Sequence, residues 1–167
     1  MRVIFLLFSI AFLYNCAGFS PLYQNRDIFN EKFKNIAITT DKNRMSLSIK
    51  KDLLKKIPPA SKKINYIIRI ETKTETESSA TATDRKTAGY EVIVTSNVFL
   101  YKRELKYDRK IYSFEEKELT MFELTPNQVL STLASRNKTF EISSENLSKT
   151  ILNRIMLYFA KENNVNK

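Results

Sequence analysis

The sequence predicts an α+β fold, a two-layer sandwich in which two helices pack on one face of a four-stranded mixed sheet, in the order β-α-β-β-β-α. Four segments repeat apolar residues at every second position, which is typical of strands, and two repeat them at every third or fourth position, which is typical of helices. The single domain expected over residues 33–163 has about 130 residues, enough to bury a workable core without disulfides.

The first two predicted elements are a strand and a helix. Residues 33–40 (FKNIAITT) are expected to form a short strand, because isoleucines alternate along them. Residues 41–56 are expected to form a helix that Asp41 or Asn43 caps. The apolar stripe of this helix, which should face the core, is Met45, Ile49 and Leu53.

The middle of the chain predicts three strands joined as an antiparallel meander. Residues 62–76, 90–101 and 107–115 each alternate between apolar and polar side chains. The threonines that follow residue 76 could extend the first of these strands, because β-branched residues favour strands. Residues 83–89 are expected to form a loop or hairpin tip.

The last predicted element is a long helix that begins at Ser143 or Ser144, since serine is a common helix cap. Residues 121–136 favour neither helix nor strand, because Pro126 interrupts any long helix there. Residues 164–167 are expected to fray as a polar tail. The apolar ladder of the helix consists of Leu147, Ile151, Ile155 and Phe159.

The composition argues against an enzyme. The chain has no His, one Cys and two Gly, which excludes Ser-His-Asp and Cys-His catalytic sites, Cys/His zinc sites and glycine-rich phosphate loops within it. We therefore expect no metal and no cofactor. The chain has 28 Lys+Arg against 18 Asp+Glu, and its formal net charge of +10 favours an anionic partner or surface.

The amino-terminal segment is typical of a bacterial lipoprotein. Residues 1–15 (MRVIFLLFSIAFLYN) resemble a signal peptide, because a positive charge precedes an apolar run that is shorter than the about 20 residues needed to span a membrane. Cys16, the only cysteine, follows directly and is the expected site of acylation, with residues 16–32 as an extended tether. The alternative is a plain secreted protein cut near Ala17 or Gly18, with Cys16 lost.

Three stretches together resemble one family. The segment CAGFSPLY resembles the start of the mature alphaproteobacterial LptE proteins, the lipopolysaccharide-assembly lipoproteins, with one inserted Ala. The stretches DRKTAGYEVIVTSNVFLY and STLASRNKTFEISSENLSKTILNRIMLYFAKE resemble the central hairpin and the carboxy-terminal segment of the same family. The resemblance implies a lipid-anchored protein on the periplasmic face of the outer membrane. There it would plug an LptD-like β-barrel, support assembly of that barrel, and bind lipopolysaccharide for insertion into the outer leaflet.

The resemblance also implies four ligand-binding residues. In the family, basic residues at the hairpin tip and just after a Leu-Ala element are associated with lipopolysaccharide binding; these positions hold Arg85 and Lys86, then Arg136 and Lys138. Cations suit the phosphates of lipid A because they form charge-assisted hydrogen bonds with them. Without the resemblance, the ordinary interpretation of such charges is a solvated surface.

Two other functions fit parts of the sequence. One is the auxiliary lipoprotein of an envelope lipid-transport ABC system, since such domains can also be small α+β units. The other is a secreted basic protein that binds anionic surfaces through its charge. The signal segment argues against nucleic acid as the partner, and no recognition-helix or RNA-binding aromatic motif supports that function.

Overall fold

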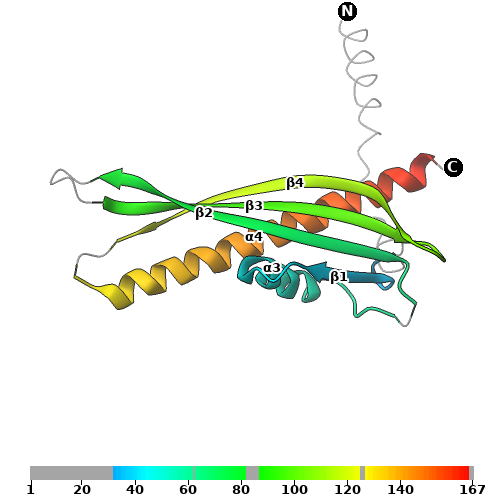
Figure 1. Ribbon diagram of the computed structural model, residues 1–167, viewed down its shortest axis with the longest axis horizontal. Coiled ribbons are helices and arrows are strands. Elements are labelled where there is room, and N and C mark those ends of the chain that lie inside the picture. The colour runs from blue at the N-terminus through cyan, green and yellow to red at the C-terminus, as the bar shows by residue number, and fades with distance from the viewer. Residues whose placement is uncertain (1–31, 62, 82–86, 125–126, 166–167) are drawn as a thin grey trace, which may run out of the picture.

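The computed structural model confirms the α+β prediction (Figure 1). It describes residues 32–61, 63–81, 87–124 and 127–165. The four strands form one mixed sheet in the order of the chain: β1 (Ile36–Thr40), β2 (Tyr66–Thr81), β3 (Thr87–Arg103) and β4 (Asp108–Glu123). The two helices lie on one side of that sheet: α3 (Arg44–Leu54) and α4 (Val129–Val165).

The sheet combines one parallel and two antiparallel pairings. β1 runs parallel to the start of β2, from the pair Ile36 and Tyr66 to the pair Thr40 and Ile70. β2, β3 and β4 form the predicted antiparallel meander. The threonine-rich continuation of β2 is strand as far as Thr81, and Thr87–Arg103 extends β3 into the segment expected to be a loop.

The core lies between the sheet and the helices. The predicted ladder of α4 is buried, with Ile151 and Ile155 fully inaccessible, and so is the predicted stripe of α3. An aromatic cluster closes one end, where Phe159 meets Phe33 and Tyr66 edge-on at ring-centroid distances of 6.0 and 5.1 Å. Each fully buried side chain of this size stabilises the fold by about 1.5–3 kcal/mol relative to exposure.

α4 begins earlier than the sequence predicts. It starts at Val129, just after Pro126, and the two serines expected to cap it lie inside it as fully buried residues. Ser143 donates a hydrogen bond to the carbonyl oxygen of Thr139 at 3.0 Å, and Ser144 donates to Asp52 of α3 at 2.7 Å. Both serines therefore make hydrogen bonds from the middle of the helix, and the prediction that one of them caps its start was wrong.

β4 also continues beyond its predicted end at residue 115, as far as Glu123. From Glu116 to Thr120 its helix-facing positions are polar and lack the apolar alternation of a half-buried strand, which returns only at buried Phe122. They are instead paired with α4: Glu116 with Arg154, Glu118 with Asn146 at 2.8 Å, and Thr120 with Ser143 at 2.7 Å. Among the described residues, no helix is apolar over enough of its length to cross a membrane.

Candidate functional site

A groove opens where the start of α3, the second half of β2 and the first half of α4 meet. Its cavity measures about 410 Å³. We call it the distal groove, because β1 and most of α3 lie toward the other end of the sheet (Figure 1). Its lining residues are Asn43, Arg44, Met45, Ser48, Thr74, Thr76, Arg136, Asn137, Phe140 and Glu141.

Hydrogen bonds fix the start of α3 against β2 beside the groove. Asn43 caps the helix by accepting from the Met45 amide at 2.9 Å, and its side-chain amide donates to the Thr72 carbonyl at 3.0 Å. Asp41 accepts from the Thr72 amide at 3.3 Å, and the hydroxyls of Ser46 and Thr72 lie 2.6 Å apart. These bonds place the first residue of α3, Arg44, at the groove.

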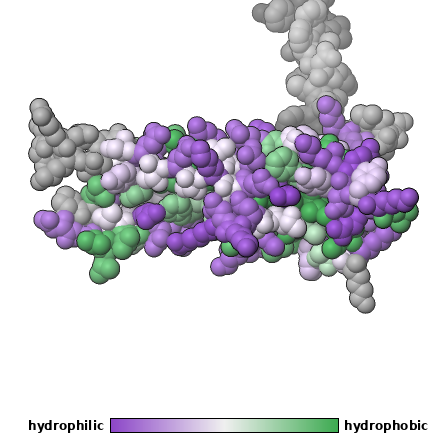
Figure 2. Space-filling view, in the orientation of Figure 1, coloured by the Kyte–Doolittle hydropathy of each residue, from purple (hydrophilic) through white to green (hydrophobic). Residues whose placement is uncertain are grey.

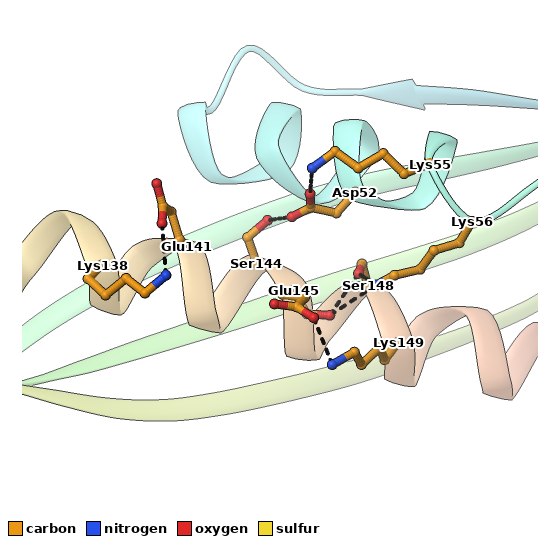
Figure 3. Close-up of polar contacts among 9 residues, drawn as sticks. All are labelled: Asp52, Lys55, Lys56, Lys138, Glu141, Ser144, Glu145, Ser148 and Lys149. Atoms are coloured by element: carbon orange, nitrogen blue, oxygen red, sulfur yellow. Dashed lines mark hydrogen bonds and ion pairs between the residues drawn. The ribbon is translucent and has the colours of Figure 1, made fainter.

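The distal groove carries unneutralised positive charge. Within the described part of the chain, neither Arg44 nor Arg136 has a carboxylate within 4.0 Å, whereas Glu141 is paired with Lys138 at 3.4 Å (Figure 3). The first turn of α3 holds no acidic residue, so the positive end of its helix dipole adds to the charge of Arg44. The groove therefore favours an anionic ligand.

Apolar and unsatisfied polar groups complete the groove. The Arg136 guanidinium lies over the Phe140 ring, 5.4 Å from its centroid, which holds the cation against an apolar wall. The Thr74 hydroxyl oxygen is buried and has no hydrogen-bond partner among the described residues. Buried hydroxyls normally have a hydrogen-bond partner, and a donor or acceptor of a bound ligand would supply the one that Thr74 lacks.

The α4 wall of the groove continues into an exposed apolar stretch. Val129, Leu130 and Leu133 are 74%, 83% and 45% exposed in the first two turns of the helix. Residues three or four apart share a helix face, so Leu133 lies on the same face as Arg136 and Asn137. Figure 2 shows apolar side chains standing out at the end of the molecule where α4 begins, on a surface that is otherwise mostly hydrophilic. Cations and apolar side chains thus follow one another along one face.

The predicted binding residues fare differently. Arg136 lines the distal groove, whereas Lys138 does not line it and pairs with the groove residue Glu141. Arg85, Lys86 and Cys16 lie outside the described residues. Sequence reasoning missed Arg44, because only the folded chain brings the start of α3 next to α4.

A second polar cluster joins α3 to α4 (Figure 3). Asp52 accepts hydrogen bonds from Ser144 and Lys55, each at 2.7 Å. Lys56 donates to Ser148 and reaches the Glu145 carbonyl oxygen at 3.4 Å. Burial alone would raise the pKa of Asp52, but the bonds from Lys55 and Ser144 and the charges of Lys55 and Lys56 outweigh it and hold this pKa below its ordinary value of 3.8.

Replacing Asp52 with Ala should lower the free energy of unfolding by about 1–3 kcal/mol, because buried Ser144 then loses its acceptor. The pKa of Asp52 is lower in the folded than in the unfolded chain, so its contribution is present above pH 3.8 and is lost as pH falls through the lower folded value. Thermal unfolding against pH measures this. Lys138→Ala, which removes an exposed pair, is the control and should change stability by less than about 0.5 kcal/mol. An equally small change for Asp52→Ala would contradict the role of the cluster.

No group of three or more His, Cys, Asp or Glu residues placed to hold a metal ion occurs in the described part of the chain. The distal groove offers hydrogen bonds, positive charge and apolar contact. That set of groups suits the binding of an anionic amphiphile.

Comparison with known proteins places the fold among bacterial lipoproteins. No protein-family model and no curated protein matches the chain. The fold is similar to that of rare lipoprotein B from Shewanella oneidensis, with a TM-score of 0.56 and 12% identity over 79% of this chain and 98% of that one. It is also similar to an uncharacterized lipoprotein B from Nitrosomonas europaea, with a TM-score of 0.60 and 13% identity over 75% and 83%. A minor lipoprotein from Acinetobacter baumannii is similar as well, with a TM-score of 0.54 and 13% identity over 75% of this chain and 92% of that one. At these identities the likeness is one of fold.

Proposed function

We propose that this chain is an outer-membrane lipoprotein of the LptE type. It is anchored on the periplasmic face through acylated Cys16, plugs an LptD-like β-barrel, supports assembly of the barrel, and binds lipopolysaccharide for insertion into the outer leaflet. The observation that carries the proposal is the distal groove, in which two arginines without a carboxylate partner among the described residues lie next to an exposed apolar stretch. The signal segment, the fold shared with bacterial lipoproteins and the sequence resemblance support it.

Lipid A matches the groove chemically. Its phosphates are anionic, and guanidinium groups bind phosphate with two parallel hydrogen bonds that a lysine cannot reproduce. Arg44 and Arg136 would hold phosphate oxygens, and the hydroxyl of Thr74 would donate to one of them. Val129, Leu130 and Leu133 would contact acyl chain, which gives these exposed side chains an apolar partner.

The surface suits a position inside a barrel. The interior of a transmembrane barrel is polar, and a plug must therefore present polar and charged side chains to it. Figure 2 shows such a surface over most of the face in view. The sheet face turned away from the helices carries same-face ion pairs, such as Arg69 with Glu71 at 2.8 Å and Lys73 with Glu75.

The experiment that tests this proposal is the isolation of the acylated protein from its native membranes and identification of what comes with it. A β-barrel partner and lipopolysaccharide are expected. Recovery with inner-membrane ABC transport components would favour the auxiliary-lipoprotein function in its place.

A further inference from the structure

The outer edge of β2 is open over most of its length. β1 has 5 residues and pairs only with the start of β2, so its last pair joins Thr40 to Ile70. β2 itself has 16 residues and continues to Thr81. Within the described part of the chain, no strand pairs with this edge beyond Ile70, and Figure 1 shows β1 reaching only one end of the sheet.

The hydrogen bonds at the end of β1 show which groups point outward from this edge. The Asp41 amide donates to the Ile70 carbonyl, and the amide and carbonyl of Thr72 bond the side chains of Asp41 and Asn43. In a strand paired antiparallel on its other side, these groups alternate in direction. The backbone groups of Thr74 and Thr76 therefore point outward at the open edge, next to the distal groove.

This edge lacks several of the usual protections. Natural sheets shield edge strands with prolines, charged side chains, inward-pointing charges or a covering helix, and of these β2 has only charges on its outward face. The open part of β2 contains no proline, and its one lysine, Lys73, is paired with Glu75 on the face away from the helices. α3 begins at Arg44 beside Thr72 and runs toward the β1 end of the sheet, away from the open edge (Figure 1).

We propose that the open edge of β2 at Thr74 and Thr76 accepts an extended segment of another polypeptide as an added strand, with side chains on the helix side entering the distal groove. Strand addition satisfies edge amides and carbonyls through main-chain bonds and takes its specificity from alternate side chains. This inference goes beyond the proposed function, because it assigns a polypeptide to the edge. Peptide side chains and lipopolysaccharide would compete for the distal groove and its two arginines.

The charges on the two faces of this edge indicate which side chains the added strand should carry. On the helix side, Arg44 and Arg136 favour a carboxylate. On the other face, Glu77 lies directly opposite Glu91 of β3, and neither has a cation partner among the described residues. Like charges directly opposite each other destabilise a sheet, so a lysine or arginine placed beside Glu77 would relieve them. The expected occupant therefore alternates basic residues outward with acidic or apolar residues inward.

A second copy of the same chain fits poorly. Antiparallel pairing of β2 with a second β2 centred on Thr74 brings Lys73 opposite Glu75 but also Glu71 opposite Glu77, and pairing centred on Glu75 brings the two copies of Glu75 together. Each such register adds like charges to a face that already holds the pair of Glu77 and Glu91. A strand of complementary charge therefore fits the edge better than a second copy of this chain does.

The test is amide hydrogen exchange on the full chain in detergent, with and without a short synthetic peptide that alternates lysine with valine around one central glutamate. The peptide should protect the amides of Thr74 and Thr76. A charge-reversed peptide, alternating glutamate with valine around a central lysine, should bind about tenfold more weakly or worse. Equal protection by both peptides, or by neither, overturns the proposal. Protection by lipopolysaccharide alone assigns the edge to lipid and overturns it as well.

Two modifications separate backbone pairing from simple charge attraction. Thr76→Pro removes one edge amide without a bond to β3 and should weaken binding about tenfold. If Thr76→Pro fails to fold, peptides N-methylated at alternate residues serve instead. Methylation on the β2-facing amides should abolish binding, and methylation on the outward amides should not. No difference between the two methylated peptides contradicts strand addition.

Discussion

Replacing both Arg44 and Arg136 with glutamate is expected to weaken lipopolysaccharide binding about a hundredfold. Each arginine would contribute charge-assisted hydrogen bonds to phosphate, and such a bond is worth about tenfold in affinity or more. Both side chains are exposed, so the fold should survive with an unfolding midpoint shifted by about a degree or two. Binding isotherms with purified lipopolysaccharide, together with thermal unfolding, measure the two effects.

The matched control changes the same charge elsewhere. Lys51 of α3 and Lys161 of α4 are exposed cations on the same two helices, and neither lines the distal groove. Their double replacement with glutamate should reduce binding only through the net charge, an effect that added salt screens. Equal weakening by the two double variants would show that the groove is not the site, since net charge would then explain both.

In cells depleted of the barrel partner, replacing Cys16 with serine is expected to move the protein from the membrane fraction to the soluble periplasmic fraction. Acyl chains contribute about 0.8 kcal/mol for each buried CH₂ group, and stable anchoring takes more than one chain. Serine cannot form the thioether or carry these chains, so the main attachment is lost altogether. Fractionation followed by immunodetection measures the loss.

Mass spectrometry of the mature amino terminus controls this prediction. In the unaltered protein, a triacylated Cys16 is expected as the first residue. A free amino terminus at Ala17 or Gly18 would mean that the thiol is removed during processing, and it would contradict every function that rests on lipid anchoring. If the Cys16→Ser protein is still recovered in the membrane fraction of cells depleted of the barrel partner, the lipid anchor at Cys16 is contradicted.

The fold was predictable wherever burial follows a simple period. The alternation along β3 and the ladder of α4 through Ile151 mark faces that are buried in the structure. The capping pattern at Asn43 also predicted a helix start correctly, because there the side chain bonds its own helix. In these elements, the local sequence pattern and the tertiary packing favour the same secondary structure.

The sequence misled where polar residues serve tertiary contacts. Ser143 and Ser144 look like helix caps, yet they bond Thr139 and Asp52 inside a helix of 37 residues. The predicted strand ended at residue 115, short of Glu123, because Glu116 and its polar neighbours face partners on α4 and break the apolar alternation. No local period encodes such pairs, since each depends on a residue far away in the chain.

The distal groove was predictable only in part. Arg136 and Lys138 were both expected from the family resemblance to bind ligand. Arg136 lines the groove, whereas Lys138 lies outside it and is paired with Glu141. Arg44 joins Arg136 only because Asn43 fixes α3 to Thr72 and α4 begins early enough to reach the same place. Both conditions depend on the assembled sheet and helices, which no single segment of the sequence specifies.

The central claim is that this protein is a lipid-anchored plug that works inside a barrel. Its most direct measurement is affinity purification of the tagged, acylated protein from outer membranes under mild detergent, followed by mass spectrometry of proteins and lipids. The account predicts an LptD-like β-barrel in stoichiometric amount, together with lipopolysaccharide that the Arg44 and Arg136 double variant loses while keeping the barrel. Recovery of the protein without a barrel, and normal lipopolysaccharide export after its depletion, would contradict the account.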